Sequence, residues 1–161
     1  MATDFFDKSL SPLLSKAAQL NQVSDRANRH IGDVEKKLSD AKIGITFWFD
    51  GPPLAQSDAK GDLGPDDFSE DTADILGYAK IDGKWCLAVK RMRFVRGFYE
   101  GDMSRRFRNV FVDGDPSPLL NASRELRLAA LRILPDFLAA FTARIDETVG
   151  EIEAATGELF L

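Results

Sequence analysis

Residues 73–92 constrain the fold more than any other part of this chain. Two runs in which apolar residues recur at alternate positions flank the dipeptide Asp82-Gly83. This dipeptide is typical of the two-residue turn of a β-hairpin, in which both central residues take a positive φ. Because such a turn fixes the pairing of the two strands, we predict that Tyr78 lies beside Leu87.

The predicted register divides the side chains of this hairpin between a bulky face and a small face. A charge pair closes the bulky face, which contains Asp74, Leu76, Tyr78, Trp85, Leu87, Val89 and Arg91. The small face contains Gly77, Ala79, Cys86 and Ala88. Small residues let a helix approach closely, whereas a bulky apolar face cannot stay bare in water. Two arrangements follow: either the helices cover the small face and leave the bulky face as an interface, or they cover both faces.

Long helical patterns precede and follow the predicted sheet. Apolar residues recur every three or four positions over about residues 9–40 and again over about 118–157. Ser11 and Ser117 are each followed by proline, a combination that is typical of an N-cap and the first position of a helix. Pro135 lies inside the second pattern and predicts a kink there.

Alternating patterns predict two further strands, at residues 43–49 and 105–112. The sheet region, about 42–112, also contains an acidic loop with glycine and proline at about 51–73. We therefore predict a single α+β domain over residues 1–161. Its four-stranded antiparallel β-meander is flanked by long N-terminal and C-terminal helices, in the order α-β-β-β-β-α.

The sequence carries no recognisable catalytic motif. Cys86 is the one cysteine and His30 the one histidine, so an internal disulfide and a multi-histidine metal site are both excluded. Phosphate-binding glycine loops and nucleophile elbows are also missing. We therefore predict no catalytic residue, no cofactor and no metal site. The single cysteine, and the lack of a signal-peptide or membrane-spanning run, favour a cytoplasmic location and no membrane partner.

A basic and aromatic segment follows the hairpin turn. Residues 84–108 contain eight Lys and Arg against two acidic residues, with Phe and Tyr interleaved. Such strands can hold single-stranded nucleic acid, although the net charge of -5 disfavours it. The alternatives are a solvated edge strand, another acidic partner, or balance by the acidic segment 50–82. The candidate partner-binding residues are Arg91, Arg93, Arg96, Arg105, Arg106, Arg108, Phe98 and Tyr99.

The second helical pattern contains an apolar stripe whose steps alternate between four and three residues, close to a coiled-coil seam. The candidate association seam is Leu138, Phe141, Ile145, Ile152 and Leu159. Both helical patterns are also longer than four strands need for cover. The leading hypothesis is a non-enzymatic interaction or assembly protein, acting as a homodimer or as a subunit of a larger complex. The alternatives are a nucleic-acid-associated accessory protein using strands 84–108, and a small-ligand binder or enzyme with a pocket between sheet and helices.

Overall fold

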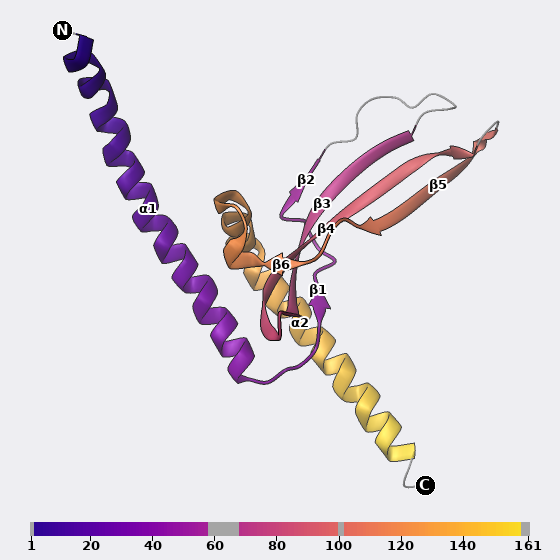
Figure 1. Ribbon diagram of the computed structural model, residues 1–161. Helices are drawn as coiled ribbons and strands as arrows, with labels where there is room; N and C mark the ends of the chain where they lie inside the picture. Colours follow the sequence, from indigo (N-terminus) through magenta and orange to yellow (C-terminus); the bar gives the residue numbers. More distant parts are fainter. Residues whose placement is uncertain (1, 58–67, 100–101, 159–161) are drawn as a thin grey trace.

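The computed structural model describes residues 2–57, 68–99 and 102–158, except for the side chains of residues 2–5, 68 and 102–104. Two long helices and a sheet extend from a shared body (Figure 1). The elements are α1 (Ala2–Asp40), β1 (Phe47–Trp48), β2 (Ala55–Gln56), β3 (Phe68–Ile81), β4 (Lys84–Tyr99), β5 (Asp102–Val112), β6 (Ser117–Pro118), the 3-10 helix η1 (Leu119–Asn121) and α2 (Arg124–Glu158). The predicted α+β class and the order of its elements are confirmed.

The sheet is antiparallel, with the strand order β1-β3-β4-β5. Two more short strands lie on its margins, β2 beside β3 and β6 beside β4. The first predicted strand, residues 43–49, forms pairs only at Phe47–Trp48. Its first half is interrupted because Lys42 and Gly44 have φ values of 53° and 65°, which an extended strand does not allow.

The hairpin between β3 and β4 has the predicted register. Tyr78 pairs with Leu87, and the turn consists of Asp82 and Gly83 alone. Their φ values of 48° and 79° are those of a primed turn, which matches the right-handed twist of the two strands. The sequence therefore places every side chain of this hairpin on its observed face.

Replacing Gly83 with valine should lower the free energy of unfolding by about 1–2 kcal/mol, because a β-branched residue resists a positive φ. An added Cβ at Gly83 meets nothing within 4 Å, so the cost is conformational and not steric. Gly83→Asn is the matched control and should cost much less, because asparagine tolerates this conformation. Urea denaturation measures both, and equal stability of the two variants would contradict the assigned turn.

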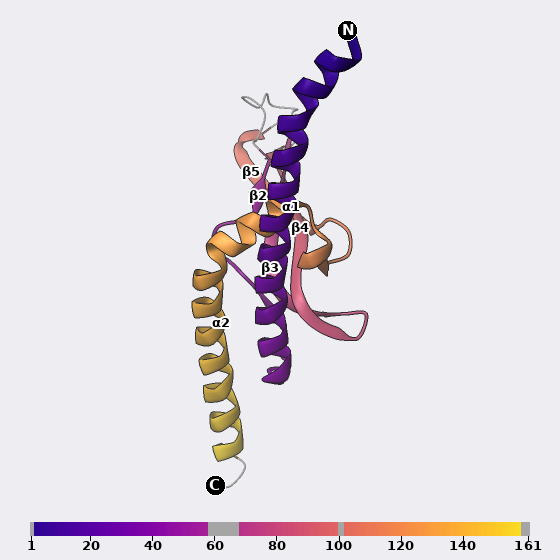
Figure 2. The ribbon, with the colours of Figure 1, turned by 90° about the vertical axis from the view of Figure 1, so that its left-hand side faces the viewer.

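Both helices pack on the bulky face of the sheet. Leu76, Tyr78, Leu87 and Val89 of this face form one core with Ile31 of α1 and with Ala130, Leu134, Phe137 and Phe141 of α2. Figure 2, seen from the side of α1, shows that helix crossing in front of the sheet with α2 beside it. The expected interface on an open bulky face is therefore wrong.

The small face is covered differently from the prediction that a helix approaches it. Trp48 pairs with Gly77, and the indole ring lies where a Cβ of residue 77 would be. The ammonium of Lys90 then lies 4.3 Å from the centroid of the indole ring. A ring from the neighbouring strand, and not a helix, uses the space that the missing side chain leaves.

The two helices begin at different residues from those predicted. α1 starts at Ala2 and continues through Pro12, whose ring removes one backbone hydrogen bond of the helix. Ser117 and Pro118 are extended and pair with β4, so α2 begins later, at Arg124. The Ser123 hydroxyl caps it by accepting a hydrogen bond of 3.3 Å from the Leu126 N–H. α2 contains Pro135 and bends in its first half (Figure 2).

Candidate functional site

The N-terminal half of α1 is an arm that leaves the body of the protein (Figures 1 and 2). It exposes large apolar side chains with relative exposures of 45–64%, which we call the α1 stripe: Leu10, Leu13, Leu14, Leu20 and Val23. Ile31 lies on the same apolar side of the helix, about two to six turns further along, and is 0% exposed because it packs in the core. One continuous apolar face is therefore buried at one end and exposed at the other.

None of the site residues predicted from the sequence lies on this helix. Its apolar periodicity is visible in the sequence, but periodicity alone does not separate a stripe that covers a sheet from one that extends past it. The separating signal is length, because 39 residues of helix are about 58 Å long at 1.5 Å per residue. A helix of that length extends past the body unless it runs along the strands, and the N-terminal half of α1 leaves the body (Figure 1).

The predicted seam of α2 is divided between the core and the surface. Phe141 is 2% exposed, and Leu138 and Ile145 pack against the core of the same chain. Ile152 is 57% exposed, and the neighbouring Val149 is 47% exposed. Leu159 lies outside the described residues. The end of α2 is thus a second helical surface with apolar side chains in solvent.

The candidate arginines of β4 pair with carboxylates of β3. The Arg91 guanidinium donates hydrogen bonds of 2.9 and 3.2 Å to Asp74, as the predicted charge pair requires. Arg93 donates to Glu70 at 2.7 Å, and Arg96 forms an ion pair with the buried Asp71. Acidic residues within the sheet therefore neutralise these three arginines.

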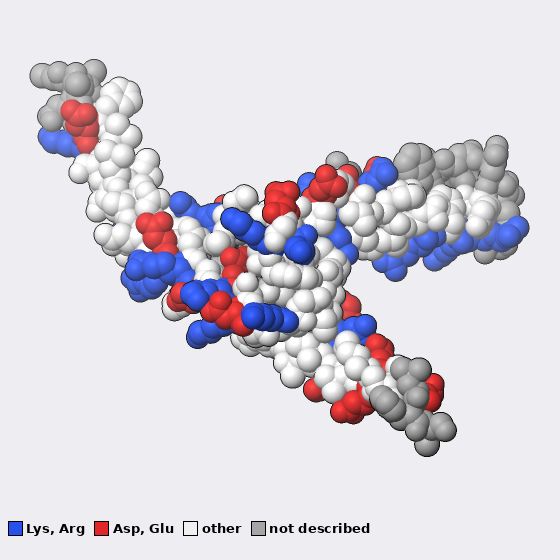
Figure 3. Space-filling model, turned by 60° about the horizontal axis from the view of Figure 1, so that its bottom comes forward, with Lys and Arg blue, Asp and Glu red and all other residues white. Residues whose placement is uncertain are grey.

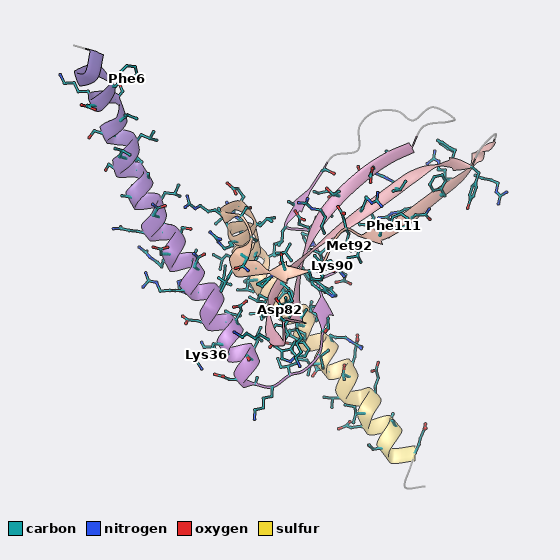
Figure 4. The ribbon with its side chains drawn as sticks, viewed as in Figure 1. Phe6, Lys36, Asp82, Lys90, Met92 and Phe111 are labelled. Carbon is teal, nitrogen blue, oxygen red and sulfur yellow. The ribbon has the colours of Figure 1, made fainter. Side chains whose placement is uncertain are left out.

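The candidate arginines of β5 form a different arrangement. Their guanidinium carbons lie 4.9–5.4 Å from the centroids of aromatic rings: Arg105 over Tyr99, Arg106 over Phe98 and Arg108 over Phe94. Within the described residues none of these three has a carboxylate partner. Figure 3 shows basic side chains along one side of the sheet arm, and Figure 4 shows Phe111 on the same arm. The sequence predicted one basic set of six arginines. Among the described residues, the three of β4 have carboxylate partners and the three of β5 do not.

Glu35 of α1 binds the backbone of β4. Its Oε1 accepts a hydrogen bond of 2.9 Å from the Leu87 N–H. Burial raises the pKa of this carboxyl, and the hydrogen bond from Leu87 opposes that shift in part. Burial, with the nearby Glu35 carboxylate, also raises the pKa of the Cys86 thiol to about 11. Cys86 is therefore a protonated thiol at neutral pH, which is a poor nucleophile.

Two cavities are lined by described residues. One, of about 290 Å³, lies on the small face and includes Asp50, Asp71, Arg96 and Arg108 in its lining. The other, of about 260 Å³, includes Asp74, Arg91, Asp113 and Asp115. Both are at or below the lower limit of roughly 300 Å³ for ligand pockets, and both lack the mostly apolar lining of such pockets. Among the described side chains no group of three or more His, Cys, Asp or Glu is placed to hold a metal ion.

No protein-family model matches this chain, and neither a curated protein nor a solved structure shows significant similarity to it. Function must therefore be argued from its surfaces. None of the helices, as far as they are described, has both the length and the apolar content needed to cross a membrane.

Proposed function

We propose that this chain is a non-enzymatic assembly protein that associates with a second copy of itself through the α1 stripe. The observation that carries the proposal is the exposure of five large apolar side chains on the face of α1 that is buried at Ile31. An apolar face of this kind is normally covered, because exposed contiguous patches beyond a few hundred Å² are rare on monomers.

The accessible surface of the chain supports association. It measures 11495 Å², about 3,500 Å² more than the roughly 8,000 Å² that size scaling gives for a compact monomer of 17.8 kDa. A standard protein interface buries about 800 Å² on each partner. The projecting helices and sheet arm therefore carry more than enough surface for one such interface.

A second copy is the simplest partner for the α1 stripe. A two-fold dimer, the commonest oligomer, would lay the stripe against itself with the two α1 helices antiparallel. The charges of this arm do not oppose such pairing, because acidic Asp7 and Asp25 alternate with basic Lys16 and Arg26 along it. The arm therefore has no block of like charge that would repel a second copy.

The two other functional hypotheses receive less support. Nucleic-acid binding through strands 84–108 is weakened because carboxylates of β3 already neutralise Arg91, Arg93 and Arg96. Small-ligand binding or catalysis is weakened by the small, charged cavities and by the raised pKa of Cys86. Association explains an exposed feature that neither alternative uses.

Light scattering tests the proposal directly. The wild-type chain should have twice the monomer mass of 17.8 kDa at tens of micromolar. The double variant Leu13→Glu/Leu20→Glu should weaken association at least about 100-fold, because two charges would be buried unpaired in the interface. A monomeric mass for the wild type would overturn self-association.

Ser15→Glu/Gln22→Glu is the matched control for that experiment. Both positions are exposed and lie on the opposite side of α1, so the control adds the same charge to the same helix. It should associate like the wild type. If it dissociates the dimer as strongly as the stripe variant does, general charge repulsion and not the stripe governs association.

A further inference from the structure

We propose that the acidic end of α2 in one copy docks on the arginines of β5 in the second copy, as an additional contact of the same dimer. This inference rests on the self-association proposed above and identifies a second surface in it. Four observations carry it: the face on which the β5 arginines lie, the charges at the end of α2, the separation of the two within one chain, and the apolar residues beside both.

The first observation concerns the β5 arginine face, which we define as Arg106, Arg108, Val110 and Val112. These alternate residues lie on the small face of the sheet, which the helices of the same chain leave uncovered, because Arg108 pairs with Arg96 and Arg106 with Phe98. The strand register thus sets two arginines directly opposite each other, an arrangement that is destabilising without an anion. Asp71 forms an ion pair with Arg96, and Arg108, which lines the same cavity as Asp71, forms no ion pair with a described carboxylate.

The second observation concerns the acidic end of α2, which contains Asp146, Glu147, Glu151, Glu153 and Glu158, all exposed. One basic residue, Arg144, lies among them and pairs with Glu147 at 3.2 Å and Glu151 at 3.6 Å. Within the described residues Asp146 and Glu153 have no such partner. They are seven residues apart and therefore lie on the same side of the helix, two turns or about 10 Å from each other.

The third observation is that the two surfaces lie on separate arms of the molecule. Figure 3 shows acidic side chains gathered at the end of α2 and basic ones along the sheet arm, and Figure 1 shows that these arms diverge from the body. Within the described residues these two sets of charges do not meet in one chain, whereas a second copy can bring them together. A two-fold axis makes this contact twice, once with each copy as the donor of α2.

The fourth observation is the apolar surface beside the charges on both sides. Val149 and Ile152 are 47% and 57% exposed and lie next to Asp146 and Glu153 on α2. Val110 and Val112 are 49% and 56% exposed and follow Arg106 and Arg108 on the same face of β5. Each surface therefore has an apolar part and a charged part, and the charges are opposite.

A nucleic acid is the competing occupant of these arginines, since its phosphates would satisfy them equally well. The net charge of -5 opposes a polyanion at long range, whereas the acidic end of α2 belongs to the chain itself. Every copy of the protein also carries the acidic end of α2, so this partner is present wherever the protein is. We therefore assign the face to α2 and make nucleic acid an outcome of the test.

Charge reversal with mixing tests the contact. Arg106→Glu/Arg108→Glu and Asp146→Lys/Glu153→Lys should each weaken self-association about tenfold, with a larger difference from wild type at low salt. An equimolar mixture of the two variants should recover the wild-type affinity. In the mixed dimer one contact is wild type on both sides and the other is reversed on both sides. Analytical ultracentrifugation measures the dissociation constants, and circular dichroism verifies that each variant is folded.

The control variant Lys80→Glu/Lys84→Glu changes the net charge by the same amount as the arginine variant, at the exposed hairpin end of the sheet, and should associate like the wild type. Wild-type affinity for both reversed variants, or no recovery on mixing, overturns the contact. Binding of a fluorescent oligo-dT that depends on Arg106 and Arg108, with unchanged self-association, assigns the face to nucleic acid and also overturns it. None of these results decides the α1 stripe, whose own variants contain no charge change at β5 or α2.

Discussion

Replacing Phe137 with alanine is expected to lower the free energy of unfolding by about 3–5 kcal/mol. The Phe137 ring is 0% exposed and is surrounded by other rings. Its centroid lies 5.5 Å from that of Phe47, 6.0 Å from Phe49 and 5.9 Å from Phe141. Removing the ring leaves a cavity between α2 and the strand β1, and the loss includes the aromatic contacts beyond the buried area.

Phe111→Ala is the control for Phe137→Ala. Phe111 is 44% exposed on the sheet arm, and the guanidinium carbon of Arg93 lies 5.2 Å from its ring centroid. This variant should cost about 1 kcal/mol or less. Guanidinium denaturation gives both values, and similar losses for the two variants would show that the core does not centre on Phe137.

The second large effect is expected at Glu35. Glu35→Ala should lower the free energy of unfolding by about 1–3 kcal/mol, because the part-buried Leu87 N–H loses its acceptor. Glu35→Gln retains an oxygen acceptor and removes the charge. It should therefore be as stable as the wild type near neutral pH, or more stable, because the cost of burying a carboxylate is gone.

The same residue sets a pH dependence whose sign is fixed by the raised pKa. Burial makes the folded protein hold the Glu35 proton more tightly than the unfolded chain does. Stability from this group is therefore complete below the unfolded pKa and is lost as pH rises through the folded value. Denaturation of the wild type and of Glu35→Gln between about pH 4 and about pH 8 measures it. The wild type should lose stability relative to the variant across that range, and a constant difference would contradict the shift.

The parts of the fold that were predictable depend on local signals. Asp82 and Gly83 determine a turn type, the turn determines the register, and the register gives the Asp74–Arg91 pair. The face that the helices cover was not predictable, because both faces of the hairpin read as apolar. Trp48, which is about thirty residues from Gly77 in the sequence, occupies the space above Gly77 on the small face, and the helices therefore pack on the bulky face.

Two other errors have the same origin. A serine followed by proline starts a helix or an extended turn equally well, and Ser117 takes the extended form because β4 offers it a pairing partner. The basic segment was recognisable from the sequence, but the sequence did not show which of its arginines have carboxylate partners. The arginines of β4 are neutralised because β4 lies beside β3, which carries the carboxylates. Arg96 pairs with Asp71 diagonally across these two strands. The α1 stripe was visible, whereas the point at which the body stops covering it required the tertiary structure.

The tight turn between β3 and β4 also has a kinetic consequence. The fourteen residue pairs of this hairpin can form in order from the turn, each closing a loop only slightly longer than the last. The hydrogen bond between Glu35 and Leu87 joins residues 52 positions apart, so docking of α1 closes a far longer loop. Because contacts between distant residues slow folding, we expect the hairpin to be formed in the transition state and α1 to dock after it. The folded hairpin then provides the surface on which the helices pack.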